Sequence, residues 1–369
     1  MDQQKPTLRQ RVAVLVHKFF RSKRGAYYFL IAFCLLVLSG VGLLAFVNQP
    51  VDYTASGFSA HPKKEPEKFY SPLTGLEVKN EAATKQAVTA IILENSPDAR
   101  PQSGLKNSGV VFEAIAEGGI TRFLALYQQE KPQLIGPVRS LRPYYLSWAA
   151  GFNPSIAHVG GSFFALKEVR NGKFRDIDQF FNGDAYWRAS DRYAPHNVYT
   201  SFKRLDALNA AKKYKTSNFT GFLRREIPKK GQPAPVIPGK KATKIQIEVS
   251  SPTYNPSYSY DAKTQTYPRS LGGVPHTDRE KGRIAPKVVI AIKIVTTLGF
   301  EDGYREQMKT IGSGEAYVFQ GGKVIKGLWR KKSKQTQMQF IEKSGKPIPL
   351  ERGQTWITAI PTNRSVTWQ

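Results

Sequence analysis

The chain has 369 residues, a formal net charge of +27 and a single cysteine, Cys34. This length allows two domains, and one cysteine excludes a disulfide framework and a thiolate zinc site. The basic excess favours an anionic environment or partner, such as a wall polymer, lipid head groups or nucleic acid. A proteome-wide habit of a basic organism is the alternative explanation.

The first feature in chain order is an apolar segment. Residues 25–47 read GAYYFLIAFCLLVLSGVGLLAFV, with no charged side chain. As a helix this run is long enough to cross the hydrocarbon core. Residues 1–24 hold seven Lys or Arg and one acid, whereas residues 48–62 hold Asp52 and neither Lys nor Arg. The positive-inside rule therefore predicts a single-pass anchor with a basic cytosolic segment at 1–24 and an extracytoplasmic body.

The apolar segment has two alternative interpretations besides a signal-anchor. A cleaved signal peptide usually has a shorter apolar core, although Leu44-Ala45-Phe46 resembles a cleavage site. A lipoprotein would use Cys34, but Phe33 stands where a small residue is expected. We therefore expect an uncleaved anchor in the cytoplasmic membrane and an inert, apolar Cys34.

A tether and a mixed domain follow the anchor. Residues 48–70 are polar, contain proline and mix Lys with Glu, as in a linker. From residue 71 to 226, β-branched runs alternate with capped helical segments, which predicts an α/β-type domain. The expected strands are 86–93, 109–115, 121–128 and 155–159, and the expected helices are 143–151, 162–171 and 201–214.

A second, smaller domain is expected to be mostly β. Residues 227–241 contain four prolines, two glycines and four lysines, which is linker composition. Residues 242–369 then carry apolar and alternating runs that predict strands. These are 242–249, 287–296, 354–360 and a hairpin formed by 315–319 and 322–330. The fold class that we predict for the whole chain is α+β.

Unusual polar strings stand at the ends of these elements, where functional residues collect. In HVGGS, a strand ends at His158 and a helix starts at Ser162, so free backbone N–H groups favour an anion. Guanidinium groups suit the same ligand. The predicted ligand-binding residues are Arg100, Arg122, Arg139, Arg142, His158, Gly160, Gly161, Ser162, Arg188, Arg192, His196 and Asn197. An ordinary tight turn, and arginines paired with structural carboxylates, remain the alternative interpretation.

Catalysis has few candidates. Glu94, Glu113 and Glu117 are possible acids, and His158 and His196 possible bases. A pair of these glutamates would suit a cell-wall or glycan hydrolase if it were separated by ~5–9.5 Å. No GxSxG, HExxH or Walker motif is present, so we favour a protein without enzymatic activity and without a cofactor.

No metal site is predicted. The candidates, Asp261, His276 and Asp278, flank Arg269, and so short a spacing is explained more often by a solvent-facing hairpin.

The same strings resemble a known family. SPLTGLEV, ENSPDARPQSGL, EAIAEGGITRFLALY, IGPVRSLRPYY, HVGGS and RYAPHN occur in the order seen in YerB-like proteins. Later strings, YDAKTQTYPRSLGGVPHTD and GSGEAYVFQGGKVIKGLW, look like that family's C-terminal domain. The resemblance covers roughly residues 70–360 and implies a two-domain bacterial envelope protein with a domain of unknown function. Two departures are the helix in place of a lipobox and Lys287 where the family pattern has Asn.

These observations together predict a binding or scaffold protein of the cell envelope with an Arg-rich anion pocket. Its expected partners are the membrane and an anionic wall polymer or small anionic ligand. Nucleic acid is disfavoured, because no recognisable motif is present and the body is expected outside the cell. The hydrolase with a glutamate pair remains the alternative function.

Overall fold

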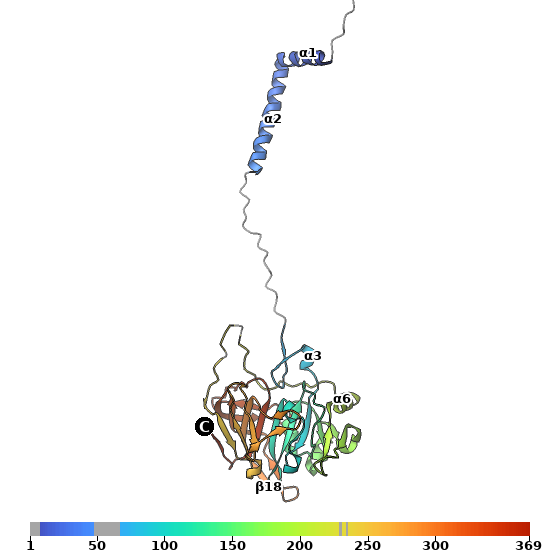
Figure 1. Ribbon diagram of the computed structural model, residues 1–369, viewed down its shortest axis with the longest axis vertical. Helices are drawn as coiled ribbons and strands as arrows, with labels where there is room; N and C mark the ends of the chain where they lie inside the picture. Colours follow the sequence, from blue (N-terminus) through green and yellow to red (C-terminus); the bar gives the residue numbers. More distant parts are fainter. Residues whose placement is uncertain (1–7, 48–66, 229–230, 234) are drawn as a thin grey trace, which may run out of the picture. The chain divides into compact units, whose positions relative to one another are not determined.

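The computed structural model describes residues 8–47, 67–228, 231–233 and 235–369 (Figure 1). Compact units are formed by Met1–Pro66 and by Glu67–Gln369, which we call the body. Residues 1–7 of the basic segment and 48–66 of the expected tether lie outside the described residues, as do 229, 230 and 234 of the expected linker.

The N-terminal unit contains two helices, α1 (Leu8–Arg21) and α2 (Lys23–Val47). The expected membrane segment, 25–47, lies within α2. Among the residues described, neither helix alone meets a length and hydropathy criterion for a membrane span. Parts of the two, Arg11–Arg21 and Lys23–Ser39, meet it together as a pair bent by 90°.

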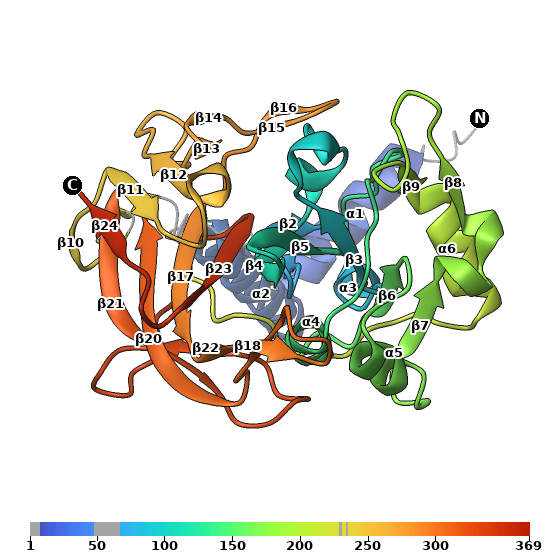
Figure 2. The same ribbon diagram turned by 90° about the horizontal axis from the view of Figure 1, so that it is seen from below.

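The body is a mixed α+β structure built on one 13-stranded sheet. Figure 2 shows its strands in order from one edge to the other. They are β10 (Lys240–Lys241), β21 (Lys323–Lys331), β20 (Gly312–Gln320), β17 (Val288–Ile294), β23 (Thr355–Pro361), β4 (Val110–Glu117), β5 (Ile120–Tyr127), β3 (Thr89–Glu94), β6 (Ser155–His158) and β7 (Arg175–Asp178). Three more strands join beside this path: β18 (Thr296–Phe300), β19 (Arg305–Met308) and β22 (Gln339–Ile341).

Smaller sheets and short helices complete the body. A five-stranded sheet consists of β14 (Val274–Pro275), β13 (Arg269–Leu271), β12 (Pro256–Ser259), β11 (Lys244–Ile247) and β24 (Val366–Trp368). Two-stranded pairs are β1 (Phe69–Tyr70) with β2 (Glu77–Val78), β8 (Tyr186–Arg188) with β9 (Val198–Thr200), and β15 (Thr277–Asp278) with β16 (Gly282–Arg283). The α-helices are α3 (Glu81–Thr84), α4 (Pro143–Ala150), α5 (Phe163–Val169) and α6 (Phe202–Ala211). The 3-10 helices are Pro97–Ala99, Leu105–Asn107, Gln179–Phe181, Gly183–Ala185 and Pro252–Tyr254.

The central strands are apolar on both faces because both faces are covered. Along β4, Val110 and Phe112 belong to one core cluster and Val111 to another, as the period of two in a strand requires. Tyr145 of α4 packs in the first cluster, and Phe202 of α6 in the second. Continuous apolar runs such as TAIIL in β3 are therefore the expected sequence signal of a doubly covered sheet.

Most of the strands and helices predicted from the sequence are confirmed. The segments 86–93, 109–115, 121–128 and 155–159 correspond to β3, β4, β5 and β6, and 143–151, 162–171 and 201–214 to α4, α5 and α6. In the second half, 242–249, 287–296 and 354–360 correspond to β11, β17 and β23. The predicted hairpin is β20–β21, with its turn at Gly321-Gly322, one residue later than expected.

The expected boundary at 227–241 lies between two halves that share one sheet. β4 of the first half pairs in parallel with β23 of the second, so that Val111 lies opposite Trp356 and Phe112 opposite Ile357. One core cluster also contains residues of both halves. The segment 227–241 therefore connects two halves of one compact body and does not separate two cores.

Candidate functional site

Many of the predicted site residues lie at one end of the sheet. Glu94, the last residue of β3, is opposite Arg122 of β5. The segment that carries the next arginines runs alongside, because Leu93 bridges to Val138 and Leu141 to Gly161. The polar strings at the ends of β3, β5 and β6 are thus brought together by the strand pairing.

Glu117 holds two of the predicted arginines. One of its carboxylate oxygens contacts Arg122 and the other contacts Arg142. Burial alone would raise the pKa of Glu117, but the two guanidinium groups outweigh it and hold that pKa below its ordinary value. Glu117 is therefore a poor proton donor near neutral pH.

Glu94 holds a second set of partners and is itself buried. Its Oε1 lies 3.1 Å from Nε of Arg139 and 2.9 Å from Nδ1 of His196, and it accepts a hydrogen bond from the Ser96 hydroxyl at 3.0 Å. His196 and Arg192 line an open cleft of about 650 Å³. Both Nη atoms of Arg192 donate to backbone carbonyls at 2.7 Å, and Asp98 and Asp191 also line this cleft, so its charges are nearly balanced.

The predicted anion site at the start of α5 is occupied by the protein's own carboxylate. The Ser162 hydroxyl donates to Oε1 of Glu301 at 2.8 Å, and the Phe164 N–H points to the same oxygen at 3.4 Å. His158 is buried, with Nδ1 2.7 Å from the Gly160 carbonyl and Nε2 3.0 Å from Asp176. These residues fix the turn after β6, and Glu301 of the β18–β19 connection caps the helix.

The remaining predicted residues serve the backbone or one another. Arg100 donates to Oδ1 and the carbonyl of Asn95 and stacks over Tyr254. Arg188 donates to the amide oxygen of Asn197 at 2.7 Å. The Asn197 amide in turn donates to the carbonyls of Ala189 and Arg192.

The end of the sheet that carries these residues is therefore a network in which most charges are paired with one another. Its arginines are engaged by Glu94, Glu117 and backbone carbonyls, so structural carboxylates neutralise much of the expected anion site. The same contacts leave the hydrolase without support, because each of its three candidate glutamates is paired with an arginine. A glycosidase acid requires a carboxyl that keeps its proton.

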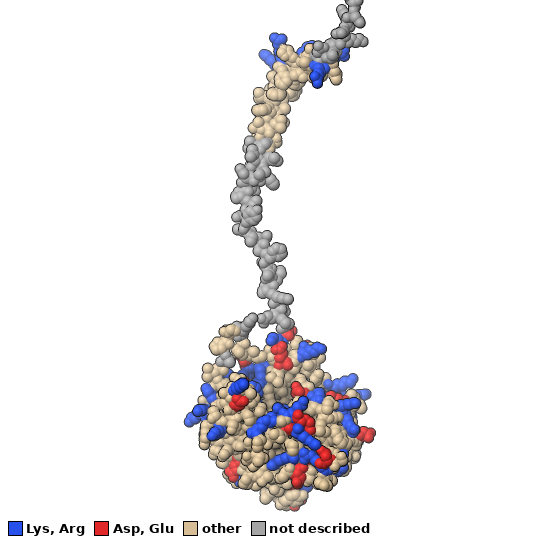
Figure 3. All heavy atoms as spheres, viewed as in Figure 1, with Lys and Arg blue, Asp and Glu red and all other residues tan. Residues whose placement is uncertain are grey.

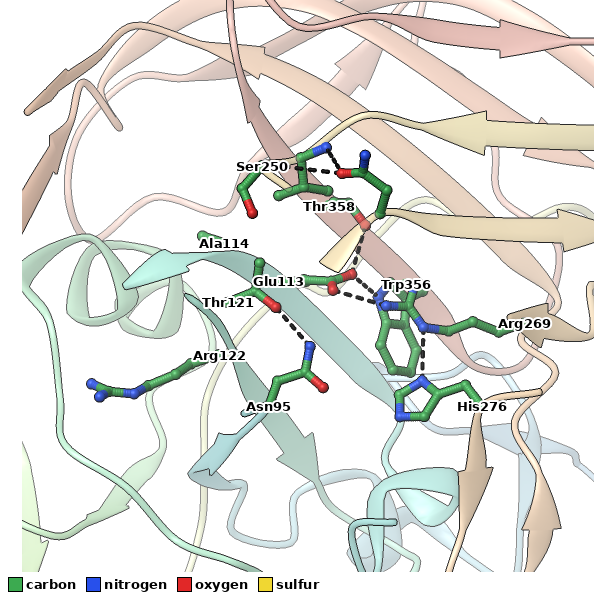
Figure 4. A network of polar contacts seen from close by, with 12 residues as sticks. Asn95, Glu113, Ala114, Thr121, Arg122, Ser250, Arg269, His276, Trp356 and Thr358 are labelled. Carbon is green, nitrogen blue, oxygen red and sulfur yellow. Dashed lines mark hydrogen bonds and ion pairs between the residues drawn. The ribbon is translucent and has the colours of Figure 1, made fainter. Parts of the chain in front are cut away.

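The third of these glutamates, Glu113 of β4, lies in the core that joins the two halves (Figure 4). Its Oε1 accepts from Nη2 of Arg269 at 2.8 Å, and its Oε2 accepts from Trp356 at 3.0 Å and Thr358 at 3.1 Å. Arg269 is fully buried and lies over the Trp356 ring at 4.5 Å. Arg122 points away from this network in Figure 4.

His276 continues the network and is held in one tautomer. Nε of Arg269 donates to its Nδ1 at 2.9 Å, so the ring proton is on Nε2, which donates to Oε1 of Gln102 at 3.0 Å. Burial, and next the Arg269 charge, hold the pKa of His276 well below its ordinary value. The ring is neutral and both nitrogens are used.

The metal candidates do not come together. Asp261 accepts from Lys263 and Thr264 within its own exposed turn. Asp278 accepts backbone N–H groups of Lys106 and Glu280. Across the described residues, no group of three or more His, Cys, Asp or Glu side chains is arranged to hold a metal ion.

A different feature, which we call the acid-free cavity, has the charge character expected of an anion site. Its volume is about 1090 Å³, and it lies where β1, the segment 218–224, the end of β21 and β22 meet. Among the described residues that line it, none is Asp or Glu. Its basic residues are Arg224, Arg330, Lys332 and Arg352. None of the predicted ligand-binding residues lines it.

Amide and aromatic side chains make up much of the rest of its wall. The amides are Asn218, Gln335, Gln337 and Gln339, and the aromatic residues are Tyr70, Phe219, Phe222 and Phe340. Within the described part of the chain, Oε1 and Nε2 of Gln337 are both buried and have no hydrogen-bond partner. Both atoms are closed off from solvent, so this amide group does not face the open space of the cavity.

Arg224 and Arg352 make this wall electropositive. Arg224 is half-buried, and its Nη atoms donate to the carbonyls of Leu73 and Glu351 and to the Thr355 hydroxyl. Burial, followed by the nearby Arg352 charge, lowers the pKa of Arg224 to about 10, so it is still protonated at neutral pH. Arg352 lies over the Tyr70 ring at 4.6 Å.

Sequence reasoning missed this cavity. Its residues come from positions 70–75 at the start of the body, from NFTGFLRR (218–225) just before the expected linker, and from the loop after β21. The only local signal was the mixture of aromatic and basic residues at 218–225, which has no defined spacing. The cavity depends on the pairing of the two halves, which no local pattern encodes.

The two halves of the body, which share one sheet, each match a known family model. The first half, at residues 73–216, matches the family model described as the DUF3048 N-terminal domain, of a protein of unknown function. Residues 245–357 match the DUF3048 C-terminal domain. The chain therefore belongs to the DUF3048 family, whose description assigns no activity.

The individual relatives agree with this assignment. The chain is 34% identical over 299 residues to a Bacillus subtilis (strain 168) protein named "Putative lipoprotein YerB", covering 80% of this chain and 87% of that protein. The crystal structure of YerB from Bacillus subtilis matches with a TM-score of 0.72 at 31% identity. That match covers 81% of this chain and all of that one. The resemblance to YerB-like proteins predicted from the motifs is confirmed.

Proposed function

We propose that this chain is a membrane-anchored envelope protein whose body lies outside the cytoplasmic membrane. Residues 25–47 carry no charge, and the described large apolar side chains of α2 are mostly exposed, so they require an apolar covering such as lipid. The seven basic residues of 1–24 favour a cytosolic N-terminus. The name of the Bacillus relative, a lipoprotein, is consistent with the same location reached by a different anchor.

Protease treatment of intact spheroplasts tests this topology. The body should be cut from the membrane beyond about residue 50, whereas an epitope tag placed before Met1 should survive until the membrane is permeabilised. Complete protection of the body before permeabilisation contradicts the topology.

We further propose that the body binds an anionic ligand of the envelope in the acid-free cavity, without catalysis. The observation that carries this proposal is the cavity's charge: four basic residues and, among described lining residues, no acid. The sheet end differs in this respect. The arginines at the sheet end are neutralised by glutamates, and Lys and Arg alternate with Asp and Glu over the face seen in Figure 3.

An anion gains most where cationic charge is enclosed and uncompensated. The acid-free cavity is lined by Arg330 near the end of β21 and by Lys332 just after it, and also by Arg224 and Arg352. Screening by salt is weaker in a partly enclosed site than on an open surface. The cavity volume of about 1090 Å³ is at the upper end for ligand sites, so it suits a segment of a polymer or a sizeable ligand.

Cosedimentation with purified cell-wall sacculi tests the binding. Full-length protein in detergent should bind sacculi in a salt-sensitive manner. The double variant Arg330→Ala/Lys332→Ala should weaken binding about fivefold or more, because it removes two lining charges. Lys244→Ala/Lys343→Ala is the matched control: it removes the same charge from exposed positions that do not line the cavity.

Equal loss in both double variants reduces the interaction to general charge attraction and contradicts the assignment of the cavity. Unchanged binding in Arg330→Ala/Lys332→Ala does so as well.

A further inference from the structure

We propose that α1 lies along the cytosolic surface of the membrane, with its apolar side against the acyl chains and its basic side among anionic lipid head groups. This inference rests on the proposed topology, in which α2 crosses the membrane from a cytosolic N-terminus. It adds a second contact between the chain and the lipid. The observations that carry it are the corner between the two helices and the distribution of side chains around α1.

The corner between the helices directs α1 across the axis of α2. Arg11–Arg21 and Lys23–Ser39 are bent by 90° relative to each other (Figure 1). The Ser22 hydroxyl donates to the Phe19 carbonyl at 3.1 Å and accepts the Gly25 N–H at 2.9 Å, so it serves the end of α1 and caps the start of α2. Gly25 permits the corner, because a side chain there would meet the Phe19 carbonyl. If α2 crosses the membrane, α1 must run along the surface.

One side of α1 is apolar and exposed. Its large apolar residues recur three and four positions apart, as in an amphipathic helix. They are Leu8, Val12, Leu15, Val16, Phe19 and Phe20. Between 48% and 79% of the surface of each of these residues is exposed. An apolar side of this size requires a covering.

This apolar side faces the direction in which α2 leads. The ring of Phe20 contacts the ring of Phe29 in α2 edge-on, with the centroids 4.9 Å apart. Phe29 lies within the segment that we expect to be surrounded by lipid, residues 25–47. Leu8, Val12 and Val16 precede Phe20 at intervals of four residues, which places them on the same side of the helix. The row is therefore turned toward the acyl chains around α2.

The other side of α1 is basic. Arg11, Lys18 and Arg21 are seven and three positions apart, so they share one side of the helix. Arg9 is in the first turn, where its long side chain reaches the head groups past its own stem. Residues 8–24 contain no Asp or Glu. Figure 3 shows Lys and Arg around α1 and none along the described part of α2 after its first turn.

A bilayer covers both sides of α1 at once, because acyl chains and charged head groups lie within the width of one helix. A second copy of α1 would cover the apolar side but bring the same positive charge. Insertion of α1 into the hydrocarbon is costly, because its 14 residues include four Lys or Arg. It is also unnecessary, because residues 25–47 are about 35 Å long as a helix, against ~30 Å of hydrocarbon.

Fluorescence of a nitrobenzoxadiazole label in nanodiscs tests the two sides of α1. Full-length protein with Cys34→Ala receives one new cysteine, either Val16→Cys on the apolar side or Val14→Cys as the matched control. Val14 is an exposed valine three positions from Arg11 and four from Lys18, on the basic side.

In nanodiscs that contain phosphatidylglycerol, the label at position 16 should be about threefold or more brighter than the label at position 14. Spin-labelled acyl chains should quench the label at position 16 and spare the label at position 14. In phosphatidylcholine alone, or with Arg11→Gln/Lys18→Gln, the difference should fall by about half or more, because the attraction to anionic head groups is lost.

Equal signals at positions 14 and 16 overturn the placement of α1. A position-16 signal that does not depend on lipid charge overturns the role of the anionic head groups. A signal that appears only in discs holding two copies of the protein assigns the apolar side to a second copy and overturns the inference. These outcomes leave the topology intact. Protection of the body in spheroplasts instead contradicts the topology, and with it the assignment of α1 to the cytosolic surface.

Discussion

Replacing Arg269 by Met tests the network that joins the two halves of the body. Arg269 is fully buried and donates to Glu113, His276 and Tyr258. Met has a similar length but no charge, so the variant leaves the Glu113 carboxylate buried without its counter-ion. Breaking a buried ion pair in this way typically costs about 3–5 kcal/mol of the free energy of unfolding.

A double variant separates the charge from the loss of packing. In Arg269→Met/Glu113→Gln the unpaired charge is gone, while the Gln oxygen still accepts from Trp356 or Thr358. We expect the double variant to be about 2 kcal/mol more stable than Arg269→Met alone, because the cost of the unpaired buried carboxylate is removed.

Urea denaturation followed by tryptophan fluorescence measures these changes, and Trp356 lies against Arg269 as a local reporter. Arg279→Met serves as the control, since its pair with Asp191 is exposed and should contribute less than about 1 kcal/mol. The reasoning is refuted if Arg269→Met costs no more than Arg279→Met, or if Glu113→Gln fails to restore stability.

Three further predictions follow from individual contacts. Burial raises the pKa of Glu306 to about 7, so its proton is bound more tightly in the folded state than in the unfolded state. The free energy of unfolding should therefore fall by about 1–2 kcal/mol as the pH rises from 5 to 8. Glu306→Gln should flatten this pH dependence in thermal melts. Glu301→Ala should lower the melting temperature by about 2–4 °C, because α5 loses its cap. The control variant Glu315→Ala, at an exposed position, should leave the melting temperature unchanged. Limited proteolysis within 227–241 should leave two fragments that co-elute in native gel filtration and separate only in denaturant, because β4 and β23 remain paired; free fragments under native conditions would contradict the shared sheet.

Local patterns were sufficient for the elements and insufficient for the way they assemble. Strands such as β4 and β17 are apolar runs of the expected length, so the sequence located them within a few residues. Nothing in either run states that β23 lies between them in parallel register. Parallel pairing of distant segments depends on the complementarity of their buried faces, which one-dimensional periodicity does not report.

The candidate site divides in the same way. The sequence correctly placed charged strings at strand ends, and the pairing of β3, β5 and β6 gathers them. Their partners were not predictable, because Glu117 reaches Arg142 25 positions away and Glu301 reaches Ser162 from the other half. A count of arginines in a string does not reveal whether a carboxylate from elsewhere neutralises them.

The arginines of the body differ in whether a carboxylate neutralises them. An arginine paired with a glutamate at the sheet end contributes to folding and has little attraction left for a ligand. An arginine held by backbone carbonyls, as Arg224 and Arg352 are, keeps its full charge while its position is fixed. Two of the four basic residues of the acid-free cavity, Arg224 and Arg352, are of this second kind. Positioning without neutralisation preserves attraction for an anion, which is the physical basis of the anion binding that we propose for this cavity.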